Sequence, residues 1–284
     1  MEKSEVTIVC FGAFGDIINS TPVAKHYKGE GKFVRWITKD SYKEVLLNNQ
    51  FIDEVKTLKN NDANSVVLSK KFKSAYFAKA NEIVLFVAPY MSPKYDGTPR
   101  STLLDILKNE TSGIKEWNCD FIPNIKLSQN EILEAKNFLS EIEGDNKILV
   151  EFESLSNQSF LNKDLLNELF GKLSGSFILT GKNEPPWFSE LGTLYPNNEF
   201  YFYSGSFMSN AEIYNNCDLF VGCCSGITCL TSSDYCATAN VKRIECCLGP
   251  HWSSNTWEHN RSNKKICYNS KQFEKEINKW RENE

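Results

Sequence analysis

The sequence lacks the features that several common protein classes require. It has no run of about 18 apolar residues, so we expect no membrane-spanning helix. Its 32 basic residues are outnumbered by 36 acidic ones, which argues against a nucleic-acid-binding protein, because such a protein needs a basic surface. The opening stretch MEKSEVTIVC carries acidic residues and only a short apolar run, unlike a secretion signal. We therefore expect a cytoplasmic protein.

The dinucleotide-binding fingerprint is also missing. The stretch FGAFGD (11–16) has two glycines three apart and then Asp16, whereas the fingerprint G-x-G-x-x-G needs a third glycine. This disfavours a Rossmann oxidoreductase with a nicotinamide or flavin cofactor. We expect no bound cofactor.

Cysteine, by contrast, is plentiful. Seven of the ten cysteines lie between residues 217 and 247, but none forms a C-x-x-C pair. His251 and His259 complete no standard ligand spacing with them. We interpret the cysteines as buried structural thiols in a reducing compartment and expect no metal; a metal site and a redox role are the alternatives.

Strands and helices alternate in the first half of the chain. Apolar strands are predicted at 6–11, 33–38, 54–58 and 82–90. A helix is predicted after the first of them, another over 41–50 after the second, and another over 101–113 after the fourth. The first helix is predicted to begin near residue 20, with Ser20 or Thr21 as its N-cap and Pro22 in its first turn. This alternation is typical of an open parallel sheet.

The same pattern restarts in the second half. Ser128 and Glu131 form a capping-box signature for a helix over 128–144. Strands are predicted at 147–152, 177–181, 200–205, 218–223 and 241–247, again with helices between them, one of which is predicted over 185–194. We predict an α/β protein of two Rossmann-like lobes facing a cleft: an N-terminal lobe at 1–127, a linker helix at 128–145, a C-terminal lobe at 146–268 and a C-terminal helix at 269–284.

Functional residues of such lobes are expected in the loops that follow strands. Gly12 and Gly15 are predicted to form a turn after the first strand. Asp16 either stabilises the positive end of the next helix or acts as a general base toward a substrate hydroxyl. Ser225, Gly226, Ile227 and Thr228 form a turn into a helix, which either binds an anion such as a diphosphate or is an ordinary helix cap.

Other candidates have a plainer interpretation. Arg100 could contact an anionic acceptor, but a simple loop is favoured, and the basic run KKFK (70–73) is interpreted as a solvated face. Trp252, Trp257 and His259 either stack on a base or sugar or pack between lobes. His26 is interpreted as structural.

Several segments resemble family-9 glycosyltransferases of the heptosyltransferase type. The opening FGAFGDIINSTPVAKHYK is similar to the family's strand, small-residue turn, Gly-Asp and Thr-Pro helix, and FVRWIT and YKEVLLNNQFIDEVKTL follow in the family's order. In the second half FILTGKNE, NAEIYNNCDLFVGCCSGITCL and CLGP resemble its later segments. The resemblance implies a GT-B fold and a metal-free, inverting transfer from a nucleotide-sugar donor to a saccharide or lipid-linked glycan acceptor. It also implies contact with the inner membrane face.

By the same resemblance, Asp16 occupies the place of the proposed base. The family's DSG..H segment corresponds to Cys224–Cys229 here, so its acidic and imidazole positions are both cysteine. A lysine of the family is replaced within SNQSFLN, where Gln158 or Ser159 is nearest, and Lys182 after Thr180 and Gly181 is the expected partial substitute. These changes leave a second possibility, a catalytically silent protein that binds a nucleotide or glycan.

Overall fold

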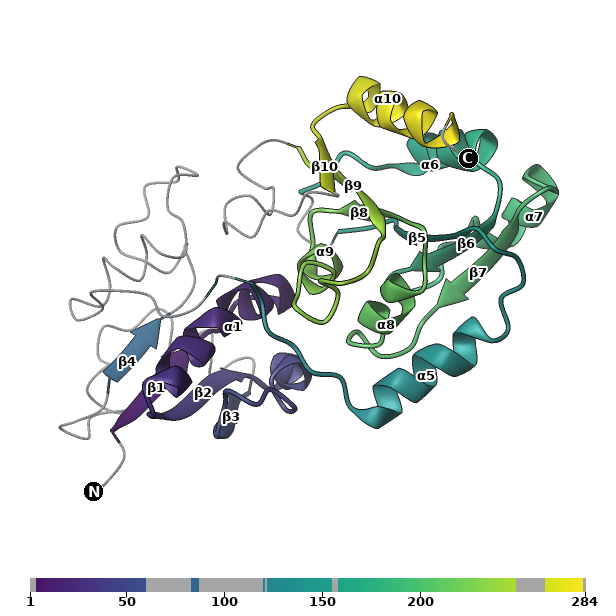
Figure 1. The fold of residues 1–284 in the computed structure, drawn as a ribbon. Helices are drawn as coiled ribbons and strands as arrows, with labels where there is room; N and C mark the ends of the chain where they lie inside the picture. The colour runs from purple at the N-terminus through teal and green to yellow at the C-terminus, as the bar shows by residue number, and fades with distance from the viewer. Residues whose placement is uncertain are drawn as a thin grey trace. The chain divides into compact units, whose positions relative to one another are not determined.

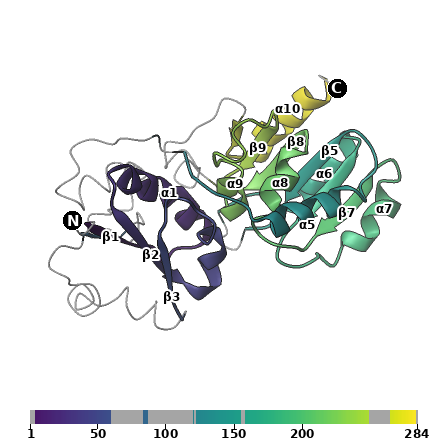
Figure 2. The same cartoon turned by 60° about the horizontal axis from the view of Figure 1, so that its bottom comes forward.

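The chain folds into two compact units, each built on a parallel β-sheet (Figure 1; Figure 2). This computed structural model describes residues 4–59, 83–86 (backbone only), 120, 122–154, 158–248 and 264–282. Unit 1 contains the described residues up to Lys126 and also Ser233–Tyr235; unit 2 contains the others, from Leu127 onward. The α/β class and the parallel sheets predicted from the alternating pattern are confirmed.

The sheet of unit 1 places β1 between its neighbours. Its elements are β1 (Glu5–Val9), α1 (Phe14–Gly29), β2 (Phe33–Lys39), the 3₁₀ helix η1 (Asp40–Val45), β3 (Glu54–Leu58) and β4 (Ile83–Phe86). Among the described strands the order is β3-β2-β1-β4, and Val9 at the end of β1 lies opposite Ile37 of β2 and Phe86 of β4. The chain therefore moves from β1 to one side and later returns to the other, so that β1 ends at a topological switch point.

Helix α1 begins earlier than the sequence pattern predicts. Its N-cap is Ala13, so the predicted caps Ser20 and Thr21 lie inside the helix together with Pro22. Ser20 Oγ instead donates to the carbonyl oxygen of Asp16, at 2.5 Å. Pro22 has no N–H for the carbonyl of Ile18, and Thr21 Oγ1 donates to that oxygen at 2.7 Å. The hydroxyl next to the proline thus replaces the missing bond and allows the helix to continue.

Unit 2 carries the larger described sheet. Its elements are α5 (Gln129–Leu139), β5 (Lys147–Glu151), α6 (Lys163–Lys172), β6 (Ser176–Thr180), η3 (Phe188–Glu190), α7 (Leu191–Leu194), β7 (Glu199–Tyr203), α8 (Asn210–Asn215), β8 (Leu219–Cys223), α9 (Gly226–Leu230), β9 (Lys242–Cys246), β10 (Lys264–Cys267) and α10 (Ser270–Arg281). Its strands are ordered β10-β9-β8-β5-β6-β7, and every described pair is parallel. Strand β10 is an addition that the apolar pattern did not predict.

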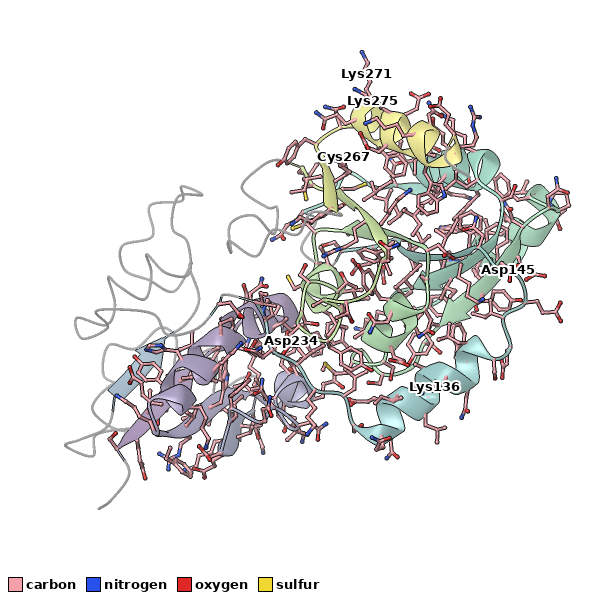
Figure 3. All side chains as sticks on the ribbon, viewed as in Figure 1. Lys136, Asp145, Asp234, Cys267, Lys271 and Lys275 are labelled. Carbon is pink, nitrogen blue, oxygen red and sulfur yellow. The ribbon has the colours of Figure 1, made fainter. Side chains whose placement is uncertain are left out.

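Helices cover both faces of this sheet. Helix α10 packs beside α6, and α5 packs beside α8 (Figure 1; Figure 2). Phe273 and Ile277 of α10 are buried, whereas Lys271 and Lys275 project from the helix away from the sheet (Figure 3). The amphipathic C-terminal helix predicted from the sequence is therefore present, and it packs on the sheet at strands β9 and β10.

The capping box of α5 forms as predicted. Ser128 Oγ accepts a hydrogen bond from the Glu131 N–H at 3.2 Å, and Glu131 Oε2 accepts from the Ser128 N–H at 2.5 Å. Two other predicted helices are shorter than expected: the helix over 41–50 is the 3₁₀ helix η1, and the helix over 185–194 is reduced to η3 and α7.

Some predictions fall outside the described residues. They are the helix over 101–113, Arg100, the run at 70–73 and the aromatic loop with Trp252, Trp257 and His259. Among the helices that are described, none has both the length and the apolarity of a membrane span.

Candidate functional site

Several of the predicted site residues follow the strands that flank a switch point of each sheet. In unit 2 the chain passes from β5 to β6 and β7 on one side, and β8, β9 and β10 occupy the other side. The switch point of this sheet is therefore between β5 and β8, where Glu151 and Cys223 end the two strands. Ligands of open α/β sheets bind outside the carboxyl ends of the strands at such points. Asp16 follows β1 at the corresponding point of unit 1.

Asp16 is the third residue of α1 and is half-buried. Its Oδ2 accepts a hydrogen bond from the Ala13 N–H at 2.9 Å, which closes the start of the helix. Gly12 is buried in the preceding loop, and Gly15 lies inside α1 rather than in a turn. Neither glycine has a positive φ, so the turn is made without the left-handed backbone that glycine favours. The Asp16 carboxylate therefore caps the start of α1, as the helix-stabilising interpretation expected.

In unit 2 the loops at the carboxyl edge contact one another. Ser154 Oγ, after β5, donates to the carbonyl oxygen of Cys224 at 3.4 Å. Further along that loop the carbonyl oxygen of Gln158 accepts from the Leu248 N–H at 2.9 Å, which joins it to the residues after β9. The structure thus brings the loops after β5, β8 and β9 together.

The loop after β6 joins the same edge. The Lys182 N–H donates to Glu153 Oε1 at 3.0 Å, and the Lys182 side chain is exposed. Thr180 is buried, and its hydroxyl donates to Asn210 Oδ1 at 2.8 Å. Lys182 is therefore accessible to a ligand, whereas the Thr180 hydroxyl is bound within the protein.

The predicted anion-binding turn starts the short helix α9. Ser225 is its N-cap, and Ser225 Oγ accepts from the Ile227 N–H at 3.1 Å. The side chains of Ile227 and Thr228 are buried. The segment thus presents its backbone and the half-buried residues Ser225 and Gly226 at the sheet edge. The Ser225 hydroxyl caps α9, as the helix-cap interpretation predicted.

A buried carboxyl group that the sequence analysis missed lies under this turn. Glu151 ends β5 and is 4% exposed; its Oε1 accepts a hydrogen bond from Ser225 Oγ. Burial raises the pKa of Glu151 to about 8, against the opposing effect of its hydrogen bonds with Ser225 and Thr228. An acidic residue at the end of the apolar strand KILVE was the signal in the sequence.

Thr228 lies beside the same carboxyl group. Thr228 Oγ1 donates to the carbonyl oxygen of Cys223 and, at 3.4 Å, to Glu151 Oε2. A hydroxyl has one hydrogen, so the two acceptors share it. The hydrogen bonds that Ser225 and Thr228 donate favour the ionised carboxylate, and burial outweighs them.

A second buried ionic group lies on β9 and β10. Glu245 Oε2 is 3.6 Å from Lys264 Nζ, and both side chains are 1% exposed. Glu245 Oε1 accepts from Cys247 Sγ at 3.3 Å. Burial lowers the pKa of Lys264, and the nearby carboxylate of Glu245 partly offsets that effect. Pairing of these groups required adjacent strands, so no local pattern in the sequence indicated it.

The described cysteines are buried or half-buried thiols, and among them the structure forms no disulfide. His26 is also buried, with Nε2 3.3 Å from Glu30 Oε1 one helical turn away. Both observations agree with the structural interpretation of these residues.

Gly181 is closely packed, and this leads to a first prediction. A Cβ at this position would lie 2.8 Å from Cε1 and Cζ of the Phe152 ring and 3.1 Å from Glu153 Oε1. We expect Gly181→Ala to lower the free energy of unfolding by about 1–3 kcal/mol, measured by urea denaturation. Gly192→Ala is the matched control, because a Cβ there meets nothing within 4 Å. Equal stabilities of the two variants would contradict the prediction.

Comparison with known proteins gives matches only at the level of structure. No family model matches the sequence, and no curated protein matches it. A glycosyltransferase family 9 structure from Veillonella parvula superposes with a TM-score of 0.65 at 14% identity, covering 100% of this chain and 98% of that chain. Escherichia coli heptosyltransferase WaaC with ADP gives 0.62 at 12%, and E. coli ADP-heptose LPS heptosyltransferase II gives 0.59 at 11%; each match covers 98% of this chain and 99% of the other. The chain therefore has the α/β fold of GT-B glycosyltransferases, as its resemblance to family 9 implied.

Proposed function

We propose that this protein is a glycosyltransferase that transfers a sugar from a nucleotide-sugar donor to a saccharide acceptor. The main support is the likeness over the whole chain to solved family-9 glycosyltransferases, combined with the position of Asp16 in the first turn of α1, the helix that follows β1. A carboxylate at a switch point, half-buried and held by the start of a helix, suits a general base.

The proposed reaction inverts the anomeric centre. Asp16 accepts the proton of the acceptor hydroxyl while the hydroxyl oxygen forms a bond to the anomeric carbon, and the bond from that carbon to the donor diphosphate breaks. The electron pair of the broken bond leaves with the diphosphate. One base is sufficient for this step, and neither a protein nucleophile nor a metal ion takes part in it.

The donor is proposed to bind at the carboxyl edge of the sheet in unit 2. Lys182 is an exposed cation there, and Gln158 lies on the neighbouring loop. Ser225 and Gly226 present backbone at the switch point. ADP is the first nucleotide to test, because the E. coli WaaC structure was solved with ADP. The buried Glu151 is neutral below its raised pKa of about 8, so it adds no negative charge near a diphosphate at pH 7.

The acceptor is proposed to be a saccharide of a surface glycan, free or lipid-linked. Such an acceptor would bring a cytoplasmic enzyme to the inner face of the membrane. The resemblance to heptosyltransferases supports this part of the proposal.

A thermal-shift screen tests the donor site, with ADP, GDP, UDP, CMP and their sugar conjugates as ligands. A ligand at about 100 times its Kd stabilises the protein by about 2.7 kcal/mol, so we expect one nucleotide to raise the Tm by several degrees. Lys182→Ala should reduce this shift. Lys271→Ala is the matched control, because Lys271 projects from α10 into solvent (Figure 3).

Release of nucleoside diphosphate with a panel of saccharide acceptors then separates an enzyme from a silent binder. A nucleotide shift with no release in any acceptor would favour the silent protein, which the cysteines at positions 224 and 229 also suggest. No shift with any nucleotide or nucleotide-sugar would contradict the proposed donor site.

A further inference from the structure

Two cysteines and a glutamate converge at the carboxyl ends of β8 and β9. The Sγ atoms of Cys224 and Cys247 and a carboxylate oxygen of Glu245 all lie within 4.8 Å of one another. Glu245 and Cys247 are buried, and Cys224 is half-buried. Within the described parts of the chain this is the one such group of potential metal ligands.

The register of the two strands explains the convergence. Cys223 of β8 lies opposite Cys246 of β9, so Cys224 and Cys247 each follow the paired strand ends. Glu245 is two residues before Cys247, and side chains two apart along a strand point to the same face. The three ligands thus come from β9 and from the residues that directly follow the paired ends of β8 and β9.

We propose that Cys224, Cys247 and Glu245 form a binding site for a thiophilic divalent cation of the zinc class. Thiolates select such ions over magnesium or calcium, and two thiolates with one carboxylate leave the fourth tetrahedral position for water or a ligand. Around a zinc ion the ligand atoms lie about 3.3–3.8 Å apart, given bonds of about 2.0–2.3 Å. The present separations are at most 4.8 Å, so a contraction of about 1 Å completes the site.

Charge balance supports the proposal. Without the ion, the buried group consists of two neutral thiols and the Glu245–Lys264 ion pair. Binding releases the two thiol protons to water and adds two positive charges, so the net charge of the buried group does not change. Lys264 stays on Oε2 of Glu245, while Oε1, which now accepts from the Cys247 thiol, becomes the ligand oxygen.

Such an ion would join the ends of β8 and β9 directly before Ser225 and α9. Its role would be to hold the sheet edge, and it is separate from the transfer step, in which no metal takes part. The inference therefore does not depend on the proposed glycosyltransfer.

The test measures metal binding by the full chain, reduced and freed of metal. We expect one zinc ion per chain by elemental analysis after addition and dialysis, two protons released per ion, and, with cobalt as the probe, a thiolate-to-cobalt absorption band. Cys224→Ser and Cys247→Ser should each weaken zinc binding by more than about 100-fold. Cys217→Ser is the matched control, because Cys217 is a buried thiol that donates to the Ile213 carbonyl; it should leave affinity unchanged within about twofold.

Circular dichroism of each variant establishes that it is folded. The variant Cys224→Asp, which restores a ligand at this position, should recover part of the zinc affinity. The proposal is wrong if the reduced protein binds no zinc or cobalt. It is also wrong if the two serine variants bind as tightly as the control. A Cys224–Cys247 disulfide in the protein as isolated, with no metal uptake after its reduction, would identify a redox pair instead.

Discussion

Asp16→Asn is expected to lower the rate of sugar transfer by about 10²–10⁴-fold while donor binding stays unchanged, because an amide cannot accept the acceptor's proton. The substitution is structurally mild. The amide oxygen of Asn can still accept the Ala13 N–H bond that Asp16 Oδ2 accepts at 2.9 Å, so α1 should begin at the same residue. The measurement is nucleoside diphosphate release with the donor identified by the nucleotide screen.

Asp40→Asn is the matched control for this experiment. Asp40 is also an acidic residue in the first turn of a helix of unit 1, where it accepts from Lys43 Nζ at 3.1 Å. This exposed pair contributes little to stability, so transfer should stay within about twofold of wild type. If Asp16→Asn retains more than a tenth of the wild-type rate, Asp16 is not the base. An unchanged nucleotide-induced Tm shift in the variant would confirm that the loss concerns the chemical step.

The second large effect is expected in the pH dependence of stability. The ordinary pKa of a glutamate is 4.5, and burial raises that of Glu151 to about 8 in the folded protein. Between these values the folded state holds one proton more than the unfolded state, so raising the pH favours unfolding. Glu151 alone should therefore increase the unfolding equilibrium constant about tenfold per pH unit from pH 5 to 8, with no further increase above the folded pKa.

Glu151→Gln should remove this slope, because the amide resembles the protonated carboxyl group and does not titrate. Urea denaturation of both proteins at about pH 5.5, 6.5 and 7.5, between the two pKa values, and at about pH 8.5, above both, gives the difference directly. Relative to wild type, the variant should gain stability at each step up to about pH 8. Subtracting the two curves of unfolding free energy against pH cancels the contributions of titratable groups that both proteins share, such as the buried His26.

Glu153→Gln is the control for this pair, since Glu153 is two residues away and half-buried at the same sheet edge. It should leave the pH slope of wild type unchanged. A constant difference between wild type and Glu151→Gln at all four pH values would show that Glu151 is ionised in the folded protein.

The periodic patterns of the sequence predicted most strands and the principal helices, because those signals are local. An apolar run such as KILVE must be buried wherever it lies, and the Ser128–Glu131 capping box needs only four consecutive residues. Local signals failed where two of them competed. Thr21 and Pro22 looked like a helix start, but the hydroxyl of Thr21 compensates for the proline inside a longer helix.

The position of Asp16 after the first strand was also readable from the sequence, because a glycine-containing loop and an acidic residue at a helix start are adjacent in the chain. Its two interpretations are compatible: the carboxylate that closes the helix start is the one proposed to act as base. The structure shows this position, in the first turn of α1 after β1, and the role of base remains a proposal.

Contacts between strands were decided by the tertiary structure alone. Glu151 meets Ser225 and Thr228 more than seventy residues later, and Cys224 meets Glu245 and Cys247 only because β8 and β9 pair in parallel. Sheet order and register depend on long-range pairing, which no short window of sequence contains. The sequence by itself thus determined the class of fold and the location of Asp16, whereas the buried carboxyl group and the thiol cluster exist because the parallel sheet of unit 2 aligns the ends of β5, β8 and β9.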